Sequence, residues 1–475
     1  MPFTQFRQDL NNALQDGSLW TSVLGEGRMI PGLYDDVALT YADYVASGRA
    51  LRQIEDFVAE QVLPFYANSH TESSYCGSYI TTLRNQARKE IATLVEAGPE
   101  DAVIFAGSGA TAGINRLVRL FAIDEAQAPV VIIGPYEHHS NILPWRETKA
   151  KIIEIQEAPT GGPDMDQLRA ALNDHAASDL VIGSFSAASN VTGIITDTDA
   201  VTRVLKAHGA LAVWDFAGGG PYLPISMSSG DTKKDAIVVS PHKFPGGPGA
   251  SGILVVNGQA VRLDRPSWPG GGTVTYVSPW EHDYAQSLEA REEAGTPNII
   301  GDIRAALAFV VKDVIGDERI QEREHHYSAL AEKAWANTPE ITILGGEVAN
   351  RLPIFSLVIR DQNGQAVSPL LITMMLSDIY GVQVRGGCSC AGPYGHRLLE
   401  IDAERAHEMR ADIVAGNTRE KPGWVRLNFS YMMQEDTAKR IAAAVEELSR
   451  TWQTHLPYYT IDARTGQPTR NLHAA

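Results

Sequence analysis

Short apolar runs recur through the first half of the chain, and stretches with helical spacing of apolar residues lie between them. The runs predict strands at residues 102–105, 130–134, 152–154, 180–183, 212–215 and 236–240. Runs of this length that alternate with helices are typical of a mostly parallel sheet. The pattern therefore predicts an α/β fold in which helices wrap a central sheet.

The same pattern indicates how the chain divides. A large domain is predicted at residues 65–310, and a smaller, discontinuous α+β domain at residues 1–64 and 311–475. The last helix of the smaller domain is predicted at residues 435–455. The residues from 458 onward are polar, and we expect them to form a loose tail.

A glycine turn links a predicted strand to an amphipathic helix within residues 103–121. Backbone N–H groups at Gly109 and Ala110, the hydroxyl of Thr111 and the positive end of the helix dipole suit a phosphate group. The turn lacks both the dinucleotide fingerprint and the Walker lysine, so taken alone it identifies no ligand.

Two other predicted strands end beside residues that suit pyridoxal phosphate. Lys243 follows the run 236–240 and precedes the glycine-rich residues 245–252, which let a flat cofactor approach a Schiff-base lysine. Asp215 ends the run 211–215, where a carboxylate keeps the ring nitrogen of the cofactor protonated. A surface lysine before a turn and an N-cap or turn aspartate are the simpler alternatives.

His138 and His139 follow the apolar residues 131–134. An imidazole at a strand exit can stack on a flat ring and move a proton at neutral pH. Adjacent histidines also suit a metal ion. No cysteine or carboxylate cluster with zinc-like spacing stands beside them, and we predict no metal site.

Four stretches resemble motifs of the class V aminotransferase family, whose members are fold-type I pyridoxal phosphate enzymes. They are Glu-His-His-Ser-Asn-Ile-Leu-Pro-Trp (137–145), Ser-Asn-Val-Thr-Gly (189–193), Ser-Pro-His-Lys (240–243) and Glu-Ala-Gly-Thr-Pro-Asn (293–298). The similarity extends from about residue 39 to about residue 448, and is greatest to group II cysteine desulfurases and selenocysteine lyases. It implies a large domain with a mostly parallel sheet of the seven-stranded type.

The resemblance implies a role for each matching residue near the ring of the cofactor. Lys243 would bind pyridoxal phosphate covalently and move the α-proton of the substrate. His138 would stack on the ring, and Asp215 would pair with the ring nitrogen. Asn190 would hydrogen-bond the ring hydroxyl.

The resemblance also implies how the phosphate group is held. Thr111, in the glycine turn, would bind it together with Ser240 and His242. Thr296 would reach the same phosphate from the other subunit of a dimer. That role of Thr296 implies an obligate homodimer with shared active sites.

The C-terminal third carries residues that decide the reaction. Residues 385–393 resemble the loop with the sulfur-accepting cysteine of group II desulfurases, and the matching position is Cys390. Arg385 supplies positive charge that favours a nucleophilic thiolate, and it is a predicted substrate contact. Arg426 matches the arginine that binds the substrate carboxylate with two hydrogen bonds. Ala46 lies in an N-terminal segment that resembles the strand and turn lining the substrate pocket.

Three departures lie where members of the family differ in their chemistry. Gly218 stands where the family usually has a glutamine that assists the ring hydroxyl, and Cys388 replaces a histidine. An insertion at about residues 393–424, with a helix predicted at residues 398–415, is longer than the connection in close relatives. It would cover the active site, alter the choice of substrate or extend the surface.

Cys388 and Cys390 also suit two roles unrelated to sulfur transfer. Together they make half of a zinc site, but the only other cysteine, Cys76, is far away in sequence. They also suit small residues packed in a tight turn. Three cysteines in 475 residues are too few for a disulfide framework.

The resemblance implies a pyridoxal phosphate-dependent cysteine desulfurase or selenocysteine lyase. It would take a small amino acid, release alanine and hold the sulfur as a persulfide on Cys390, from which a sulfur-acceptor protein would receive it. The same fold also carries out C–S bond elimination, epimerisation and amino transfer, in which Cys390 would be incidental. A degenerate, non-enzymatic homologue is a third alternative, against which the retained Lys243, Asp215 and His138 argue.

Charge and hydropathy exclude other classes of protein. The formal net charge of −17 opposes binding to nucleic acid or to an anionic membrane. The N-terminal segment has no apolar signal core, and no run approaches roughly 18 uninterrupted apolar residues. We therefore expect a soluble cytoplasmic protein.

The polar residues 68–77 contain His70, a further candidate for the substrate site.

Overall fold

In a computed structural model, which describes residues 2–68 and 72–471, the chain divides into two compact units. Unit 1 consists of Met1–Val23, Ser47–Ala188 and Ile195–Asp317. Unit 2 consists of Leu24–Ala46, Ser189–Ile194 and Glu318–Ala475. Residues 1–23 and 47–64, which the sequence assigned to the smaller domain, therefore group with unit 1. His70 lies outside the described residues.

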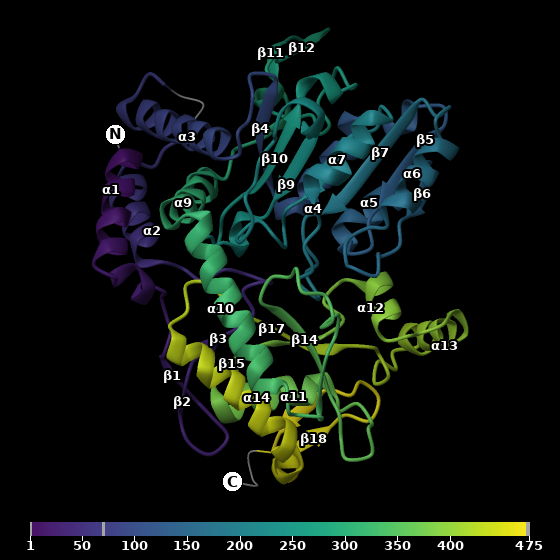
Figure 1. The fold of residues 1–475 in the computed structure, drawn as a ribbon. Coiled ribbons are helices and arrows are strands. Elements are labelled where there is room, and N and C mark those ends of the chain that lie inside the picture. The colour runs from purple at the N-terminus through teal and green to yellow at the C-terminus, as the bar shows by residue number, and fades with distance from the viewer. Residues whose placement is uncertain (1, 69–71, 472–475) are drawn as a thin grey trace. The chain divides into compact units, whose positions relative to one another are not determined.

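The centre of unit 1 is a seven-stranded sheet with the strand order β4-β10-β9-β8-β7-β5-β6 (Figure 1). The strands are β4 (Asp101–Gly107), β5 (Pro129–Ile133), β6 (Lys151–Glu154), β7 (Leu180–Ser186), β8 (Leu211–Asp215), β9 (Ala236–Val239) and β10 (Gly252–Asn257). Strands β5 to β9 pair in parallel, whereas β10 is antiparallel to both of its neighbours. The predicted mostly parallel sheet is confirmed, with β10 as a strand that the sequence did not predict.

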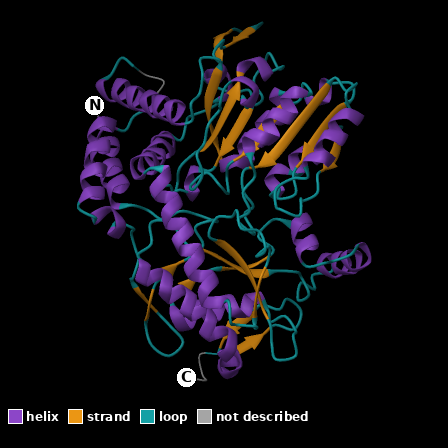
Figure 2. Cartoon of the chain, viewed as in Figure 1, coloured by secondary structure: helices purple, strands orange, loops and turns teal. Residues whose placement is uncertain are grey.

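The helices of unit 1 are α1 (Pro2–Gln15), α2 (Arg52–Phe57), α3 (Tyr75–Leu94), α4 (Gly109–Leu120), α5 (Leu143–Arg146), α6 (Met165–Asp174), α7 (Thr198–Ala207), α8 (Leu288–Glu292) and α9 (Ile299–Ile315). They flank this sheet, except for α1 and α2, which pack against α9 (Figure 2). Helix α4 buries Ile114, Leu117 and Leu120 in a cluster with Val238 and Leu254 of the sheet. This packing fixes the helix whose first turn follows the glycine turn after β4. Strands β11 (Val274–Val277) and β12 (His282–Tyr284) form a separate hairpin.

Unit 2 is built on a four-stranded antiparallel sheet with the order β13-β14-β17-β16. Its strands are β13 (Ile341–Ile343), β14 (Ile354–Ile359), β16 (Arg385–Gly387) and β17 (Trp424–Asn428), and its larger helices are α10 (Asp317–Trp335), α11 (Pro369–Tyr380) and α14 (Glu435–His455). The short strands β1 (Met29–Ile30), β2 (Val37–Ala38), β3 (Thr40–Tyr41) and β15 (Val382–Gln383) make two further pairs. Helix α14 matches the predicted last helix.

The expected loose tail is wrong for the residues that the structure describes there. Strands β18 (Tyr459–Ile461) and β19 (Pro468–Arg470) pair as an antiparallel hairpin. Oδ1 of Asp462 accepts the N–H groups of Arg464 and Thr465, which closes the turn, and Tyr459 packs in the core of unit 2. Local turn chemistry and one buried aromatic ring therefore order a polar segment.

The insertion folds as two helices instead of the single one predicted (Figure 1). These are α12 (Gly392–Leu398) and α13 (Ala403–Val414). Glu400 between them has a φ of 53°, which helices do not allow, and Asp402 caps α13 by accepting the N–H of Arg405. Among the described residues, no helix is long and apolar enough to cross a membrane.

Candidate active site

The glycine turn after β4 forms a cradle of backbone N–H groups in unit 1. Gly109 begins α4 with a φ of +63°, and a Cβ there would lie 3.0 Å from both Oγ of Ser240 and Cε1 of His242. The N–H of Ala110 donates to Oγ of Ser240 at 2.9 Å. The structure thus brings together four of the residues predicted to hold a phosphate, at the positive end of a twelve-residue helix.

His242 enters this cradle as a neutral imidazole. Burial lowers the pKa of His242 to about 4, and the charge of neighbouring Lys243 contributes to this lowering. A neutral ring can donate one hydrogen bond to an anion without adding a positive charge of its own. The cationic contribution to the cradle therefore comes from Lys243 and the helix dipole.

Lys243 ends a 3₁₀ turn, Pro241–Lys243, that directly follows β9. The N–H of Lys243 donates to the carbonyl of Ser240 at 3.0 Å, and the carbonyl of His242 accepts the N–H of Gly48 at 2.8 Å. A Cβ at Gly247 would lie only 1.8 Å from the carbonyl oxygen of Pro241, so the chain folds back on itself where no side chain fits. These contacts fix the backbone from which the Lys243 side chain extends.

Asp215 is a buried carboxyl group at the end of β8, with 3% of its surface exposed. Burial raises its pKa, against which the N–H of Ala217, donating to Oδ1 at 2.7 Å, and the charge of Lys243 lower it. Among the described residues, that N–H is the only hydrogen-bond donor to Asp215. A buried carboxylate with one backbone hydrogen bond has capacity for a cationic N–H partner.

Hydrogen bonds connect His138 to the cradle. Oγ of Ser140 lies 2.7 Å from Oγ1 of Thr111 and 3.0 Å from Nδ1 of His138. Nδ1 also accepts the N–H of Ser140 at 3.1 Å, so a neutral His138 carries its proton on Nε2. Thr111 and His138, which are predicted to bind opposite ends of one cofactor, are thus joined through a single serine.

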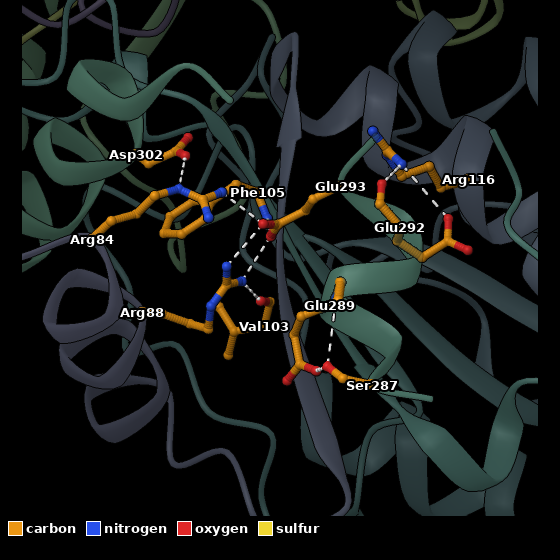
Figure 3. Close-up of polar contacts among 11 residues, drawn as sticks. Arg84, Arg88, Val103, Phe105, Arg116, Ser287, Glu289, Glu292, Glu293 and Asp302 are labelled. Carbon is orange, nitrogen blue, oxygen red and sulfur yellow. Dashed lines mark hydrogen bonds and ion pairs between the residues drawn. The ribbon is translucent and has the colours of Figure 1, made fainter. Parts of the chain in front are cut away.

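The loop that carries Thr296 is anchored by ion pairs (Figure 3). Glu293 accepts hydrogen bonds from Arg84 at 2.6 Å, from Arg88 at 2.7 and 2.8 Å, and from the N–H of Phe105 at 2.8 Å. Burial raises the pKa of Glu293, but the two arginines and this N–H hold it below its usual value. Three residues beyond this anchor, Thr296 is exposed.

Further contacts hold the residues on either side of Glu293. Nε of Arg84 also donates to Asp302 on α9 at 2.7 Å, and Glu292 accepts the N–H of Ser267 at 2.9 Å (Figure 3 shows the arginine contacts). The guanidinium groups of Arg84 and Arg88 lie over the ring of Phe105, at 5.0 and 4.7 Å from its centre. The segment before Thr296 is therefore held on α3, β4 and α9.

Unit 2 holds the residues predicted to bind the substrate carboxylate. Arg426 on β17 pairs directly with Arg385 on β16 in the antiparallel register. Both arginines bind Asp43: Nη2 of Arg426 donates to Oδ1 at 2.9 Å, and Nε of Arg385 to Oδ2 at 3.2 Å. Two guanidinium groups on one carboxylate leave a net positive charge, which attracts a second carboxylate. Ala46 lies three residues after Asp43, and its N–H donates to the carbonyl of that aspartate at 3.0 Å.

The cysteine loop of unit 2 is a tight turn in an uncommon conformation. Ser389 and Cys390 have φ values of 52° and 57°, in the left-handed region that non-glycine residues seldom adopt. Nδ2 of Asn190 donates to the carbonyl of Ser389 at 2.9 Å, and Nη1 of Arg426 donates to the carbonyl of Asn190 at 3.1 Å. The turn leaves Cys390 exposed, while Ser389 is buried.

The prediction missed three carboxylates that organise these residues. Asp43 couples the two substrate arginines, Glu293 anchors the Thr296 loop, and Glu137 accepts hydrogen bonds at the exit of β5. Glu137 and Glu293 lie inside motifs that the sequence analysis had identified, so their position within a motif could have indicated that these carboxylates matter.

Gly218 lies in a turn after Asp215, between Ala217 and two more glycines.

A family model, Aminotransferase class-V, matches residues 40–421. The chain belongs to this family. It is therefore an enzyme of the pyridoxal phosphate-dependent type, as the sequence motifs predicted.

Curated relatives in the class V family agree with this assignment. The chain is 27% identical over 415 residues to a probable cysteine desulfurase of Vibrio cholerae, covering 86% of this chain and 93% of the relative. It is 29% identical over 360 residues to a cysteine desulfurase of Escherichia coli, covering 75% and 85% of the two chains.

Solved structures show the same class V fold. The apo structure of the cysteine desulfurase of Thermococcus onnurineus superposes with a TM-score of 0.71 at 21% identity, over 87% of this chain and 95% of the other. A cysteine desulfurase of Escherichia coli gives a TM-score of 0.67 at 22% identity, over 86% and 94% of the chains. These matches confirm the predicted α/β fold.

Proposed function

We propose that this class V enzyme is a cysteine desulfurase, which converts a small sulfur-bearing or selenium-bearing amino acid to alanine and keeps the sulfur as a persulfide. The exposed Cys390, on a left-handed turn held by Asn190, carries the proposal. Unusual backbone conformations persist at functional sites because the surroundings maintain them. A thiol in such an exposed turn is accessible to a substrate sulfur.

The residues of unit 1 fit pyridoxal phosphate. The cradle at Gly109 to Thr111 suits the phosphate, and Asp215 is a buried carboxylate with capacity for one more donor, which suits a protonated ring nitrogen. Lys243 would hold the cofactor covalently, and His138 would lie on the ring. Asn190, a residue of unit 2, is assigned to the ring hydroxyl from its match to the family motif. When bound, the cofactor supplies an electron sink for the substrate carbon.

The side chains of the protein perform the remaining tasks. Arg426 and Arg385 bind the substrate carboxylate, with Asp43 fixing both guanidinium groups. The amine of Lys243 removes the α-proton and later returns a proton to carbon.

Cys390 accepts the sulfur atom from the substrate. Its thiolate attacks the substrate sulfur, so that an S–S bond forms as the C–S bond breaks. The bonding pair of the C–S bond goes to the β-carbon, which is then protonated, and alanine leaves. No external oxidant or reductant is consumed in this step.

We also propose that the enzyme is a homodimer in which Thr296 of one subunit serves the phosphate of the other. The exposure of Thr296 and the anchoring of its loop through Glu293 support this arrangement.

A sulfur-acceptor protein would then take the outer sulfur of the persulfide from Cys390. We place the reaction in the cytoplasm, because Cys390 has to be a reduced thiol at the start of each turnover.

The decisive experiment is product analysis of Cys390→Ala with cysteine as substrate. We expect cofactor binding and the spectral response to cysteine to persist, while persulfide is lost and alanine formation falls by at least about 100-fold. Cys388→Ala, the matched control two residues away, should retain most of the parental rate. Alanine or pyruvate released by Cys390→Ala at the parental rate would refute the desulfurase assignment.

A further inference from the structure

The insertion borders an open pocket of about 430 Å³, whose lining comes from α12, α13, Lys421, Pro422, Trp424 and Cys388. Pockets of roughly 300–1,000 Å³ with apolar walls and a few polar groups are typical binding sites for small molecules. The pocket therefore lies in the segment where the chain departs from the pattern of its family.

One face of α13 forms the apolar wall of the pocket. Met409 and Ile413, four residues apart, line it together with Pro422 and Trp424. Gly395 of α12 lies against the indole of Trp424, where a Cβ would be 3.0 Å from Cη2. Apolar surface left open in this way is stabilised when a ligand covers it.

Apart from the thiol of Cys388, the ionisable groups around this wall are all basic residues. His396, His407, Arg410 and Lys421 line the pocket, and none of its described lining residues is acidic. Neither Arg410 nor Lys421 uses its side chain in a hydrogen bond or ion pair with another described residue.

Two of the acidic neighbours in sequence are paired elsewhere, and the third, Asp412, does not line the pocket. Glu408 binds Arg405 at 3.0 Å, and Glu420 lies 4.0 Å from Arg419. In a chain with a formal net charge of −17, a pocket with two such cations and no acid among its described lining residues is selective for negative charge.

We propose that this pocket is a binding site for a small apolar carboxylic acid, with its alkyl or aryl body against Met409, Ile413 and Trp424 and its carboxylate at Arg410 and Lys421. A neutral apolar molecule would leave both cations without a partner, and an apolar amine would be repelled by them. Because Cys388 lines the pocket, the occupant contacts the loop that ends in Cys390.

Calorimetry on the full-length holoenzyme tests the charge preference. Octanoate should bind saturably, with one site per chain, and at least about tenfold more tightly than octylamine, which has the same alkyl body. Arg410→Glu and Lys421→Glu should each weaken octanoate binding by at least about tenfold. Arg405→Glu, on the same helix but outside the pocket, should leave the affinity within about twofold. Equal affinities for octanoate and octylamine, or equal losses in Arg405→Glu, would overturn the proposal.

A labelling experiment tests the location without any substitution. Octanoate should slow the alkylation of Cys388 by N-ethylmaleimide at least about fivefold, as followed by mass spectrometry, and should leave Cys76 unaffected. Unchanged alkylation of Cys388 at saturating octanoate would show that the acid binds elsewhere. Octanoate binding should also persist in Cys390→Ala, so the desulfurase assignment and the pocket can fail independently.

Discussion

Glu137 is a carboxyl group that is 2% exposed, at the exit of β5, with three donors directed at it. The N–H and Oγ of Ser186 donate to it at 2.8 and 2.7 Å, and Nδ2 of Asn141 donates at 2.5 Å. Oδ1 of Asn141 in turn accepts from Trp145 and Ser184, which fixes the orientation of the amide. Burial raises the pKa of Glu137 to about 7, with the negative charge of Asp215 adding to the rise and the hydrogen bonds opposing it.

This elevated pKa predicts a pH-dependent contribution to stability. The folded state holds a proton on Glu137 that the unfolded chain releases near its ordinary pKa of 4.5. The stabilisation is therefore complete below that value and is lost as the pH rises towards about 7. As the pH rises from about 5 to about 8, the parent should lose about 2 kcal/mol of its free energy of unfolding compared with Glu137→Gln, which has no carboxyl group to titrate at this position.

Urea unfolding at several pH values measures this difference. Glu147→Gln, which changes an exposed carboxylate ten residues further along the chain, should run parallel to the parent over the same range. A parallel course for Glu137→Gln as well would mean that Glu137 is ionised in the folded protein throughout.

Which site residues could be predicted depended on where they stand along the chain. Asp215, Lys243 and Thr111 directly follow or end apolar runs, so the sequence alone placed them at one end of the sheet. Asp43 is 383 residues from Arg426, and no local pattern shows that they form an ion pair. Such contacts are set by tertiary packing, which a single sequence does not display.

At the scale of elements, the anchor around Glu293 joins four separate segments: α3, β4, α9 and the loop before Thr296 (Figure 3). Removing one charge from a buried ion pair leaves its partner without compensation, at a cost of about 3–5 kcal/mol. Glu293→Gln would leave Arg88 in that state, whereas Arg84 would keep its ion pair with Asp302. It should lower the free energy of unfolding by about 3 kcal/mol and weaken the binding of pyridoxal phosphate by about tenfold, through the loosened Thr296 loop.

Glu289→Gln provides the matched control, because Glu289 lies on the preceding helix and bonds only locally among the described residues, to Ser287 at 2.6 Å. It should change the free energy of unfolding by less than about 0.5 kcal/mol. If Glu293→Gln destabilised the fold but bound the cofactor as the parent does, the anchor would be structural and unconnected to the phosphate.

The elements themselves divide into those with local signals and those without. Strands β5, β7, β8 and β9 are mostly buried apolar runs bounded by turns, β6 is a half-buried strand at the sheet edge, and all five were predicted within a few residues. Strand β10 follows a glycine-rich turn and owes its place to antiparallel pairing with β4 and β9. The hairpin β18–β19 depends on the capping oxygen of Asp462 and on the burial of Tyr459, neither of which hydropathy measures.

At the scale of the whole molecule, the proposed exchange of Thr296 between subunits predicts a complementation pattern. In a heterodimer of one Lys243→Ala subunit and one Thr296→Ala subunit, the site with an intact lysine would receive an intact Thr296 from its partner. At limiting cofactor, such a heterodimer should recover about half of the parental activity, whereas both homodimers should be impaired. Purification with two different affinity tags isolates it.

The reciprocal heterodimer gives the opposite expectation. When Lys243→Ala and Thr296→Ala are on one subunit, paired with a parental subunit, the only site with a lysine would face an alanine at position 296. Its activity should therefore fall to about half that of the Thr296→Ala homodimer, which has two such sites. Half of the parental activity in this arrangement, with only about half of the Thr296→Ala activity in the first, would show that Thr296 serves its own subunit.

The division of the chain into units also bears on how the protein is made. The polypeptide passes from one unit to the other after residues 23, 46, 188, 194 and 317. All of unit 1 has been synthesised once residue 317 is added, so it can fold while translation continues. Residues 24–46 and 189–194, with Asp43 and Asn190 among them, have to wait for the strands that bear Arg426 and the cysteine loop. A ribosome that stops soon after residue 317 would therefore release a chain that contains Lys243 and Asp215 but lacks Cys390. Because each unit consists of several segments, no cut at a single point in the gene separates the two units.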